Sequence, residues 1–508
     1  MHYSKLAKLC GVAVSLTMFV AACSSSSTKT ATSSAPTTTA AATATTAGAT
    51  ASTAGATATT AGVTPTTAGT TATTAGSASG DLDATYGKGA QAFKNAIDAT
   101  KSKPLVAAGD PFIISMPNLE GDAGGSFPDF REGAQAAVKL INERLGGIGA
   151  DYKAGKPGRP IKLNVCSHGL TPDAAQACAN TVAGEKPNLV TIGIDFFTQA
   201  MYPVFQQFPI IQTLPIFVAD FTQKGAFSAI GGCPTAFFGA ANFLATKGYD
   251  KVAVMYSDNG PGHECYTDTT ERPLQYLKDQ GKIADFKGYA NKPGDPSDDA
   301  AQYQEITTFL AGAKKPAVFY SVASSDCVDW TKGLRAAGYT ADLVMGSACV
   351  DKTVEALPEA VGAAFEFQSY NPDSPTLTDF EKFELGARSD AIKAFGPKAA
   401  VGTFMEDSFG SILWSWQIAN NMVADGKDPF DRAALSSALK ALPPFHFIGR
   451  PAVDCSGNPA EFPAICFRKN TYLTWDGKAF GPEDALKGKY QDLTDLMNQV
   501  AAKNQRKK

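Results

Sequence analysis

The chain has 508 residues, with 45 Lys and Arg, 49 Asp and Glu, and a formal net charge of −4. This mild negative charge, without a basic stripe, argues against a protein that binds nucleic acid. More than 400 residues follow residue 80. That length allows a sizeable core and predicts two domains.

Residues 1–22 are typical of an export signal. Lys5 and Lys8 precede an apolar run over residues 9–22, which is shorter than the about 20 residues of a membrane span. Val-Ala-Ala then precedes Cys23, and this arrangement resembles a bacterial lipobox. The resemblance implies cleavage before Cys23 and a diacylglyceryl group on its sulfur, hence an extracytoplasmic protein anchored to the bacterial cell membrane. The alternative is an ordinary signal peptide with an incidental cysteine.

Residues 23–80 consist almost entirely of Ser, Thr, Ala and Gly, and a seven-residue repeat runs through them: ATTAGAT (44–50), ASTAGAT (51–57) and ATTAGVT (58–64). No position of this repeat is regularly large and apolar, which excludes a coiled coil. Such a composition buries too little apolar surface to offset the entropy lost on ordering. We therefore predict a disordered tether, whose ends lie on the order of 40 Å apart.

Apolar strand patterns alternate with amphipathic helix patterns from about residue 105 to residue 369. The expected strands are 111–116, 159–165, 188–193, 251–256, 316–322 and 341–347. The expected helices are 127–147, 171–183, 197–207, 264–280 and 326–338. This alternation predicts an α/β fold with parallel sheets that are covered on both faces.

The pattern changes after residue 369, where a long helix at 402–426 precedes short strand-like pieces. We expect this part of the chain to complete the first lobe and then to add a final strand or two. The predicted division comprises a first lobe (105–231 plus 372–445), a second lobe (233–369 plus 446–485) and a C-terminal tail (486–508).

Eight cysteines remain in the folded part of the chain, and an even number in an exported protein indicates disulfides. Many connectivities are open, and we expect the sequential one. It pairs Cys166 with Cys178, Cys233 with Cys265, Cys327 with Cys349, and Cys455 with Cys466. The chain has no C-x-x-C and only four histidines, so we expect no zinc or other metal site.

Several segments, in their order and spacing, resemble the leucine/isoleucine/valine-binding family. They begin with PNLEGDAGGSFPDFREGAQAAVKLINERLGGIG (117–149) and continue with GRPIKLNV, TPDAAQACANTV and VTIG. DFTQKG (220–225), KVAVMYSDNGPGHE (251–264) and LRAAGYTADLVMGSA (334–348) follow downstream. These are type I solute-binding proteins of ABC importers. The resemblance implies two Rossmann-like lobes with parallel sheets, joined by hinge crossings, that close on a small ligand without a cofactor.

In the first lobe, the ligand is expected at loops beyond the carboxyl ends of the strands. Glu120 and Phe127 lie in the first such loop, and the alternative for Phe127 is a place in the core. In the second loop (193–199), the family has a Ser/Thr-rich turn where this chain has Asp195, Phe196 and Phe197, and only Thr198 remains of that type. Phe217 replaces the family's threonine in the third loop.

In the second lobe, Ser321, Ser324 and Ser347 are expected to orient the ligand through their hydroxyls. Family members that bind α-amino acids hold the ammonium with a tyrosine and an acid in these loops. Ala323 or Ser324 aligns with the tyrosine here, and Ala348 with the acid. A buried ammonium without a counter-charge is costly. We therefore predict an apolar or aromatic ligand rather than a free aliphatic amino acid.

Alternative functions have less support in the sequence. No G-x-S-x-G, H-E-x-x-H or P-loop motif indicates an enzyme, and His168 and His446 have no catalytic neighbours in sequence. A receptor that senses a ligand without transporting it, or a wall-attached structural protein, stays open. The prediction is a lipid-anchored, extracytoplasmic solute-binding protein that delivers its ligand to an ABC permease.

Overall fold

The computed structural model describes residues 81–122, 125–291, 299–321, 324–397 and 403–505. The predicted signal peptide, the predicted tether and Cys23 lie outside these residues. Among the helices in the described ranges, none is long and apolar enough to cross a bilayer.

The first lobe is built on a five-stranded sheet with the order β2-β1-β3-β4-β5, in which all neighbouring strands are parallel. Its strands are β1 (Phe112–Leu119), β2 (Ile161–His168), β3 (Leu189–Ile192), β4 (Ile210–Gln212) and β5 (Ala226–Ser228). Successive side chains point to opposite faces. Leu189 and Ile211 therefore enter one core cluster, and Val190 and Ile210 enter another.

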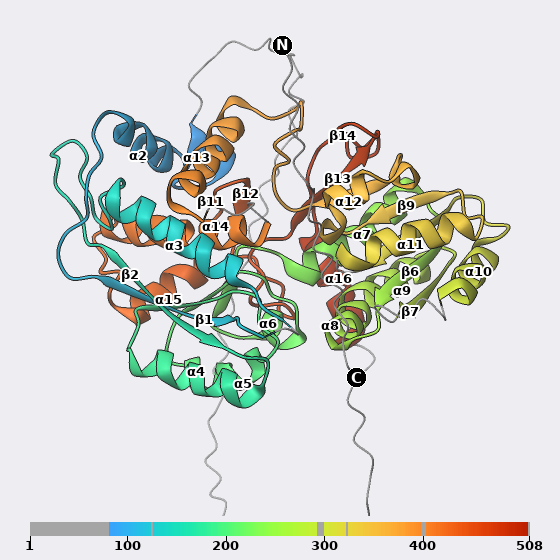
Figure 1. Cartoon of the computed structure of the whole chain (residues 1–508), viewed down its shortest axis with the longest axis horizontal. Coiled ribbons are helices and arrows are strands. Elements are labelled where there is room, and N and C mark those ends of the chain that lie inside the picture. Colours follow the sequence, from blue (N-terminus) through green and yellow to red (C-terminus); the bar gives the residue numbers. More distant parts are fainter. Residues whose placement is uncertain (1–80, 123–124, 292–298, 322–323, 398–402, 506–508) are drawn as a thin grey trace, which may run out of the picture. The chain divides into compact units, whose positions relative to one another are not determined.

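Helices cover both faces of this sheet (Figure 1). One face packs against α3 (Pro128–Glu143), α13 (Asp379–Phe395), α14 (Thr403–Ala424) and α15 (Arg432–Lys440). The other packs against α4 (Pro172–Gly184) and α5 (Thr198–Phe205). The start of α4 follows local chemistry, because the Thr171 hydroxyl accepts a hydrogen bond from the Ala174 amide at 3.2 Å.

The second lobe has a larger sheet with the order β14-β13-β10-β9-β8-β6-β7, and β15 pairs with β13. The strands from β7 to β10 are parallel, and β13, β14 and β15 pair antiparallel. The strands are β6 (Lys251–Ser257), β7 (Asp285–Asn291), β8 (Pro316–Ser321), β9 (Asp342–Met345), β10 (Ala364–Phe367), β13 (Lys469–Trp475), β14 (Phe480–Pro482) and β15 (Gln491–Asp492). The predicted α/β fold with two lobes is confirmed, and the second sheet is mixed rather than wholly parallel.

Helices also surround the second sheet (Figure 1). They are α7 (Gly232–Lys247), α8 (Gly260–Glu264), a π-helical turn (Cys265–Glu271), α9 (Arg272–Asp279), α10 (Asp299–Leu310), α11 (Ser324–Ala336) and α12 (Lys352–Glu355), with 3₁₀ turns at Ser347–Cys349 and Pro358–Ala360. Because Val254 and Met255 face opposite sides of β6, they enter separate core clusters.

The predicted boundary of the second lobe at residue 446 is wrong. Strands β11 (Phe445–Phe447) and β12 (Arg450–Val453) form a two-stranded antiparallel sheet, and their apolar side chains lie in the core of the first lobe. The ring of Phe447, for example, lies 6.1 Å from the ring of Trp414 on α14. The apolar content of this segment therefore completes the first core, and the chain enters the second sheet only at β13.

Both ends of the folded part extend beyond the predicted lobes. Helices α1 (Leu82–Tyr86) and α2 (Ala90–Ser102) precede residue 105, and Phe93 on α2 is fully buried in the core of the first lobe. The predicted C-terminal tail at 486–508 is instead folded in its described part. There β15 pairs with β13, and α16 (Thr494–Gln505) buries Met497 and Val500 because these apolar residues share one helix face.

Four disulfides join cysteines that are close in sequence, in the sequential order that the sequence analysis expected. The pairs are Cys166–Cys178, Cys233–Cys265, Cys327–Cys349 and Cys455–Cys466. Closing such short loops restricts the unfolded chain, and each bridge of this kind contributes about 2–4 kcal/mol to stability.

Candidate ligand-binding site

The first sheet reverses its strand order between β1 and β3, and the loops that follow these two strands lie at this switch point. In open α/β sheets, ligands bind beyond the carboxyl ends of the strands at such a point. Phe127 follows β1, Phe196 follows β3, and Phe217 follows β4. The local chain order thus brings three predicted ligand-binding side chains to one edge of the sheet.

The structure brings these three phenylalanines into contact. Phe196 lies edge-on to both Phe127 and Phe217, with ring centroids 5.8 Å and 6.2 Å apart. Phe404 of α14, which the sequence analysis did not identify, lies edge-on to Phe127 at 6.0 Å. All four rings are partly exposed. We call Phe127, Phe196, Phe217 and Phe404 the aromatic cluster; it offers an apolar surface for a flat or aliphatic group.

Two other predicted residues of the first lobe lie away from the aromatic cluster. Phe197 packs against the core cluster formed with α4 and α5. Thr198 begins α5 and is 3% exposed. Phe197 and Thr198 come next after Phe196 in the sequence, but the turn into α5 directs them toward the layer formed by α4 and α5.

Glu120 is held by Arg131 of α3. Its carboxylate accepts hydrogen bonds from the Arg131 Nη2 at 2.8 Å and Nε at 3.0 Å, and from the Asn118 amide at 3.0 Å. The hydrogen bonds from Arg131 are the main reason why the pKa of Glu120 is lowered, although partial burial opposes them. Glu120 is therefore an ionised carboxylate whose charge is balanced by Arg131. It lies near the aromatic cluster, because Asn118 donates both to Glu120 and to the carbonyl oxygen of Phe127.

A buried His–Asp pair lies directly behind Phe196. His168 ends β2, and its Nε2 lies 2.7 Å from the Asp195 carboxylate, with both side chains almost fully buried. Its Nδ1 lies 3.0 Å from the carbonyl oxygen of Gly169. Both partners are acceptors, so a ring that donates to both is an imidazolium. Burial lowers the pKa of His168, but the hydrogen bond and the charge of Asp195 outweigh it, and the pKa is raised.

The loop that carries Phe217 is fixed by Asp220, a buried residue of α6 (Val218–Thr222). Its carboxylate accepts hydrogen bonds from the amides of Ile216 and Phe217, each at 3.0 Å, and from the Tyr202 hydroxyl at 2.7 Å. Burial raises the pKa of Asp220, while these hydrogen bonds lower it in part. Asp220 thus positions Phe217 through the backbone.

In the second lobe, the carboxyl ends of the strands carry hydroxyl groups, including that of Tyr256 near the end of β6, whose ring is partly exposed. Ser321 ends β8, is buried, and its hydroxyl has no hydrogen-bond partner among the described residues. Ser347 is exposed, and its amide donates to the Glu366 carboxylate at 3.2 Å. Glu366 is fully buried, and this burial raises its pKa. Ser324 begins α11, and its side chain lies outside the described part of the structure.

The two lobes meet next to Phe217. The amide of Val218 donates to the carboxylate of Glu264 in the second lobe at 2.9 Å. Gly232, where the chain enters the second lobe, has a φ of 54°, and a Cβ on it would lie 2.0 Å from the carbonyl oxygen of Pro215. Glycine therefore permits this close approach. The loop of Phe217 consequently lies where the second lobe begins.

A sequence profile of the family described as "Periplasmic binding protein" matches residues 117–468. The chain belongs to the periplasmic binding protein family. No curated protein sequence matches the chain.

Solved structures of periplasmic binding proteins share the fold at low sequence identity. An ABC transporter substrate-binding protein from Sphaerobacter thermophilus has a TM-score of 0.56 and 17% identity, over 75% of this chain and 98% of that one. A leucine-binding protein from Thermotoga maritima has a TM-score of 0.51 and 13% identity, over 72% and 97%. A solute-binding protein from R. palustris, solved in complex with benzoate, has a TM-score of 0.52 and 14% identity. The match covers 75% of this chain and 99% of that one.

Membership of this family makes the chain a ligand-binding protein that functions outside the cytoplasm. The predicted resemblance to leucine/isoleucine/valine-binding proteins is confirmed. Sequence reasoning found Phe127 and Phe196 because each follows an expected strand, and it found Phe217 through the family resemblance. It missed Phe404 and Asp220, and it did not pair Asp195 with His168, because the partners lie in other elements.

Proposed function

We propose that this periplasmic binding protein holds a small aromatic or apolar solute between its lobes and delivers it to an ABC permease. The observation that carries the proposal is the aromatic cluster at the switch point of the first sheet. Aromatic rings bind flat apolar groups through edge-on and stacked contacts, while a few polar groups set the orientation. The benzoate complex of the R. palustris protein with the same fold supports this class of ligand.

The second lobe supports the exclusion of free aliphatic amino acids. Ala348 occupies the position where the family places an acid for the ammonium, and it is exposed next to Ser347. The buried carboxylate of Glu366 accepts a hydrogen bond from the amide of Ser347. The buried Ser321 hydroxyl instead offers a neutral donor or acceptor for a ligand oxygen.

A thermal-shift screen of the full chain tests the ligand class. The panel contains benzoate, phenylacetate, benzamide, leucine and valine, each at about 100-fold over a micromolar dissociation constant, where a ligand stabilises by about 2.7 kcal/mol. We expect stabilisation by an aromatic compound and none by leucine or valine. A shift with leucine or valine alone would contradict the proposal.

The membrane anchor is part of the same proposal and has its own test. We propose that Cys23 carries the lipid and that residues 24–80 form the tether. Replacing Cys23→Ala should move the protein from the membrane fraction to the soluble fraction of the producing bacterium. A Cys23→Ala protein that still incorporates labelled fatty acid and stays with the membrane would refute the anchor, without affecting the ligand site.

A further inference from the structure

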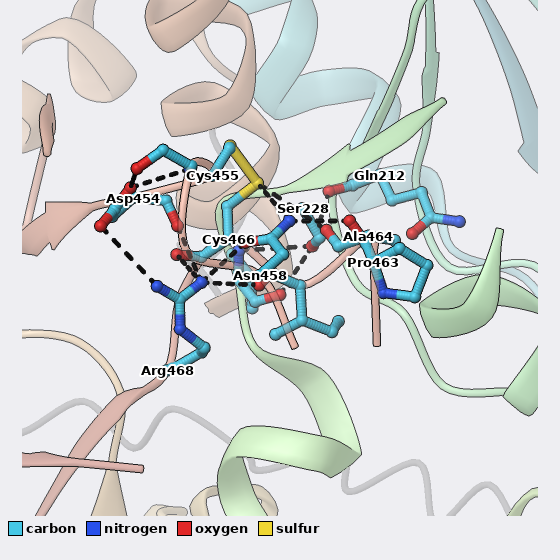
Figure 2. Close-up of a disulfide and its surroundings, with 12 residues drawn as sticks. Gln212, Ser228, Asp454, Cys455, Asn458, Pro463, Ala464, Cys466 and Arg468 are labelled. Atoms are coloured by element: carbon cyan, nitrogen blue, oxygen red, sulfur yellow. Dashed lines mark hydrogen bonds and ion pairs between the residues drawn. A yellow bond between two sulfur atoms is a disulfide. The ribbon is translucent and has the colours of Figure 1, made fainter. Parts of the chain in front are cut away.

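The loop closed by the Cys455–Cys466 disulfide runs beside the last strand of the first sheet (Figure 2). The Ser228 amide of β5 donates to the carbonyl of Ala464 at 2.7 Å, and the Cys466 amide donates to the carbonyl of Ser228 at 3.0 Å. We call residues 455–466 the disulfide loop. It therefore extends the edge of the first sheet just before the chain crosses to β13.

Arg468 lies beside the disulfide loop (Figure 2) and ties it to the C-terminal helix. This buried guanidinium donates to the carbonyl of Asp454 at 2.8 Å and to the Asn458 side chain at 2.7 Å. Its Nε donates to the Thr494 hydroxyl at the start of α16 at 2.9 Å. One side chain thus fixes the disulfide loop and α16 to each other.

A separate apolar cluster fills the space between these segments and both lobes. At its centre, Phe462 of the disulfide loop lies edge-on to Phe221 of α6 in the first lobe, at 5.5 Å, and to Phe238 of α7 in the second lobe, at 5.6 Å. The cluster also contains Ile465, Leu493, Met497 and Val500, and each of its residues is at most 2% exposed. Elements of both lobes therefore share one core with the C-terminal helix.

Polar contacts continue this connection along α9 of the second lobe. Arg272 forms an ion pair with Glu461 of the disulfide loop. Tyr276 donates to Gln499 of α16 at 2.9 Å, and Asp279 pairs with Lys503. The disulfide loop and α16 are thus attached to the second lobe as well as to the first.

We propose that the disulfide loop and α16 form a clasp, centred on Phe462, that limits the separation of the lobes in the ligand-free protein. Rotation that separates α6 from α7 must pull Phe462 away from Phe221 or Phe238 and expose apolar side chains to water, which is unfavourable. Since α6 also carries the loop of Phe217, the clasp positions the aromatic cluster against the second lobe. This inference concerns the free protein and does not depend on the identity of the solute.

The test measures the distance between the lobes in the full chain without ligand. Nitroxide labels are attached through unnatural amino acids at the exposed positions Thr181 on α4 and Lys282 after α9. Double electron–electron resonance spectroscopy then gives the distribution of distances between the two labels for the wild type, for Phe462→Ala and for the control Phe309→Ala. Phe309 is a partly buried phenylalanine of α10 that packs within the second lobe alone.

We expect Phe462→Ala to broaden the distribution toward longer distances, while Phe309→Ala retains the wild-type distribution. Phe462→Leu, which restores most of the apolar volume, should return the distribution toward that of the wild type. If Phe462→Ala does not fold, Glu461→Gln, which keeps the side-chain volume and removes the ion pair with Arg272, should show a smaller shift in the same direction. Distributions of the folded clasp variants that match the control overturn the proposal.

Discussion

The carboxyl-end edges of the two sheets present different chemistry, although both lobes repeat the same α/β arrangement. The edge of the first lobe carries the aromatic cluster, and the buried His168–Asp195 pair lies behind it. The edge of the second lobe carries the buried Ser321 hydroxyl and the exposed Ser347. Under the proposed function, the first lobe would contribute most of the apolar contact with the ligand, and the second lobe would orient it.

The largest expected effect comes from the centre of the aromatic cluster. Phe196 touches the rings on both sides of it, so Phe196→Ala removes the contact surface that joins Phe127 to Phe217. We expect a loss of about 2 kcal/mol in binding free energy, which is about 30-fold in the dissociation constant. Isothermal titration calorimetry with benzoate as the probe measures the dissociation constant, and Phe309→Ala is the matched control. Equal affinities of the two variants would place the ligand away from the cluster.

An intermediate effect is expected from the His168–Asp195 pair, as a dependence of stability on pH. The pKa of His168 is raised in the folded protein, while the unfolded value is about 6.5. The pair's contribution is therefore complete below pH of about 6.5 and is lost as the pH rises through the folded pKa.

Urea unfolding of the wild type and of His168→Asn, over a series of pH values, measures this contribution. The difference in the free energy of unfolding should decrease as the pH rises from slightly acid to alkaline values. Asp195→Asn is the control, because removing the carboxylate should remove most of this dependence. A difference that stays constant or increases with pH would show that His168 is neutral in the fold.

Sequence patterns located many of the alternating strands and helices, but not β4, β5 or α7, and they located two of the four rings of the aromatic cluster. The family resemblance supplied the third ring, Phe217. The start of α4 at Thr171 was predictable because a cap acts within its own first turn. Phe404 was not, because it reaches Phe127 only after the chain has built the second lobe and returned. The same holds for His168 and Asp195, which belong to separate strand–loop units. Leu493, Met497 and Val500, by contrast, have a helical spacing that was present in the sequence.

The smallest expected effect belongs to the second lobe. Ser321→Ala should weaken the binding of benzoate by about 0.5–1.5 kcal/mol if the hydroxyl orients the carboxylate, which is the usual contribution of one hydrogen bond. Ser437→Ala on the exposed face of α15 is the matched control and should bind as the wild type does. A loss from Ser321→Ala that exceeds the loss from Phe196→Ala would reverse the proposed roles of the lobes.

Helix α2 lies in the core of the first lobe, with Phe93 fully buried there. Under the proposed anchor, a force applied through residue 80 would reach the first lobe before the second, because residues 81–102 lead directly into the core of the first lobe. If the proposed anchor holds the first lobe, ligand binding would move the second lobe, and the position of its surface would then differ between the free and the ligand-bound protein.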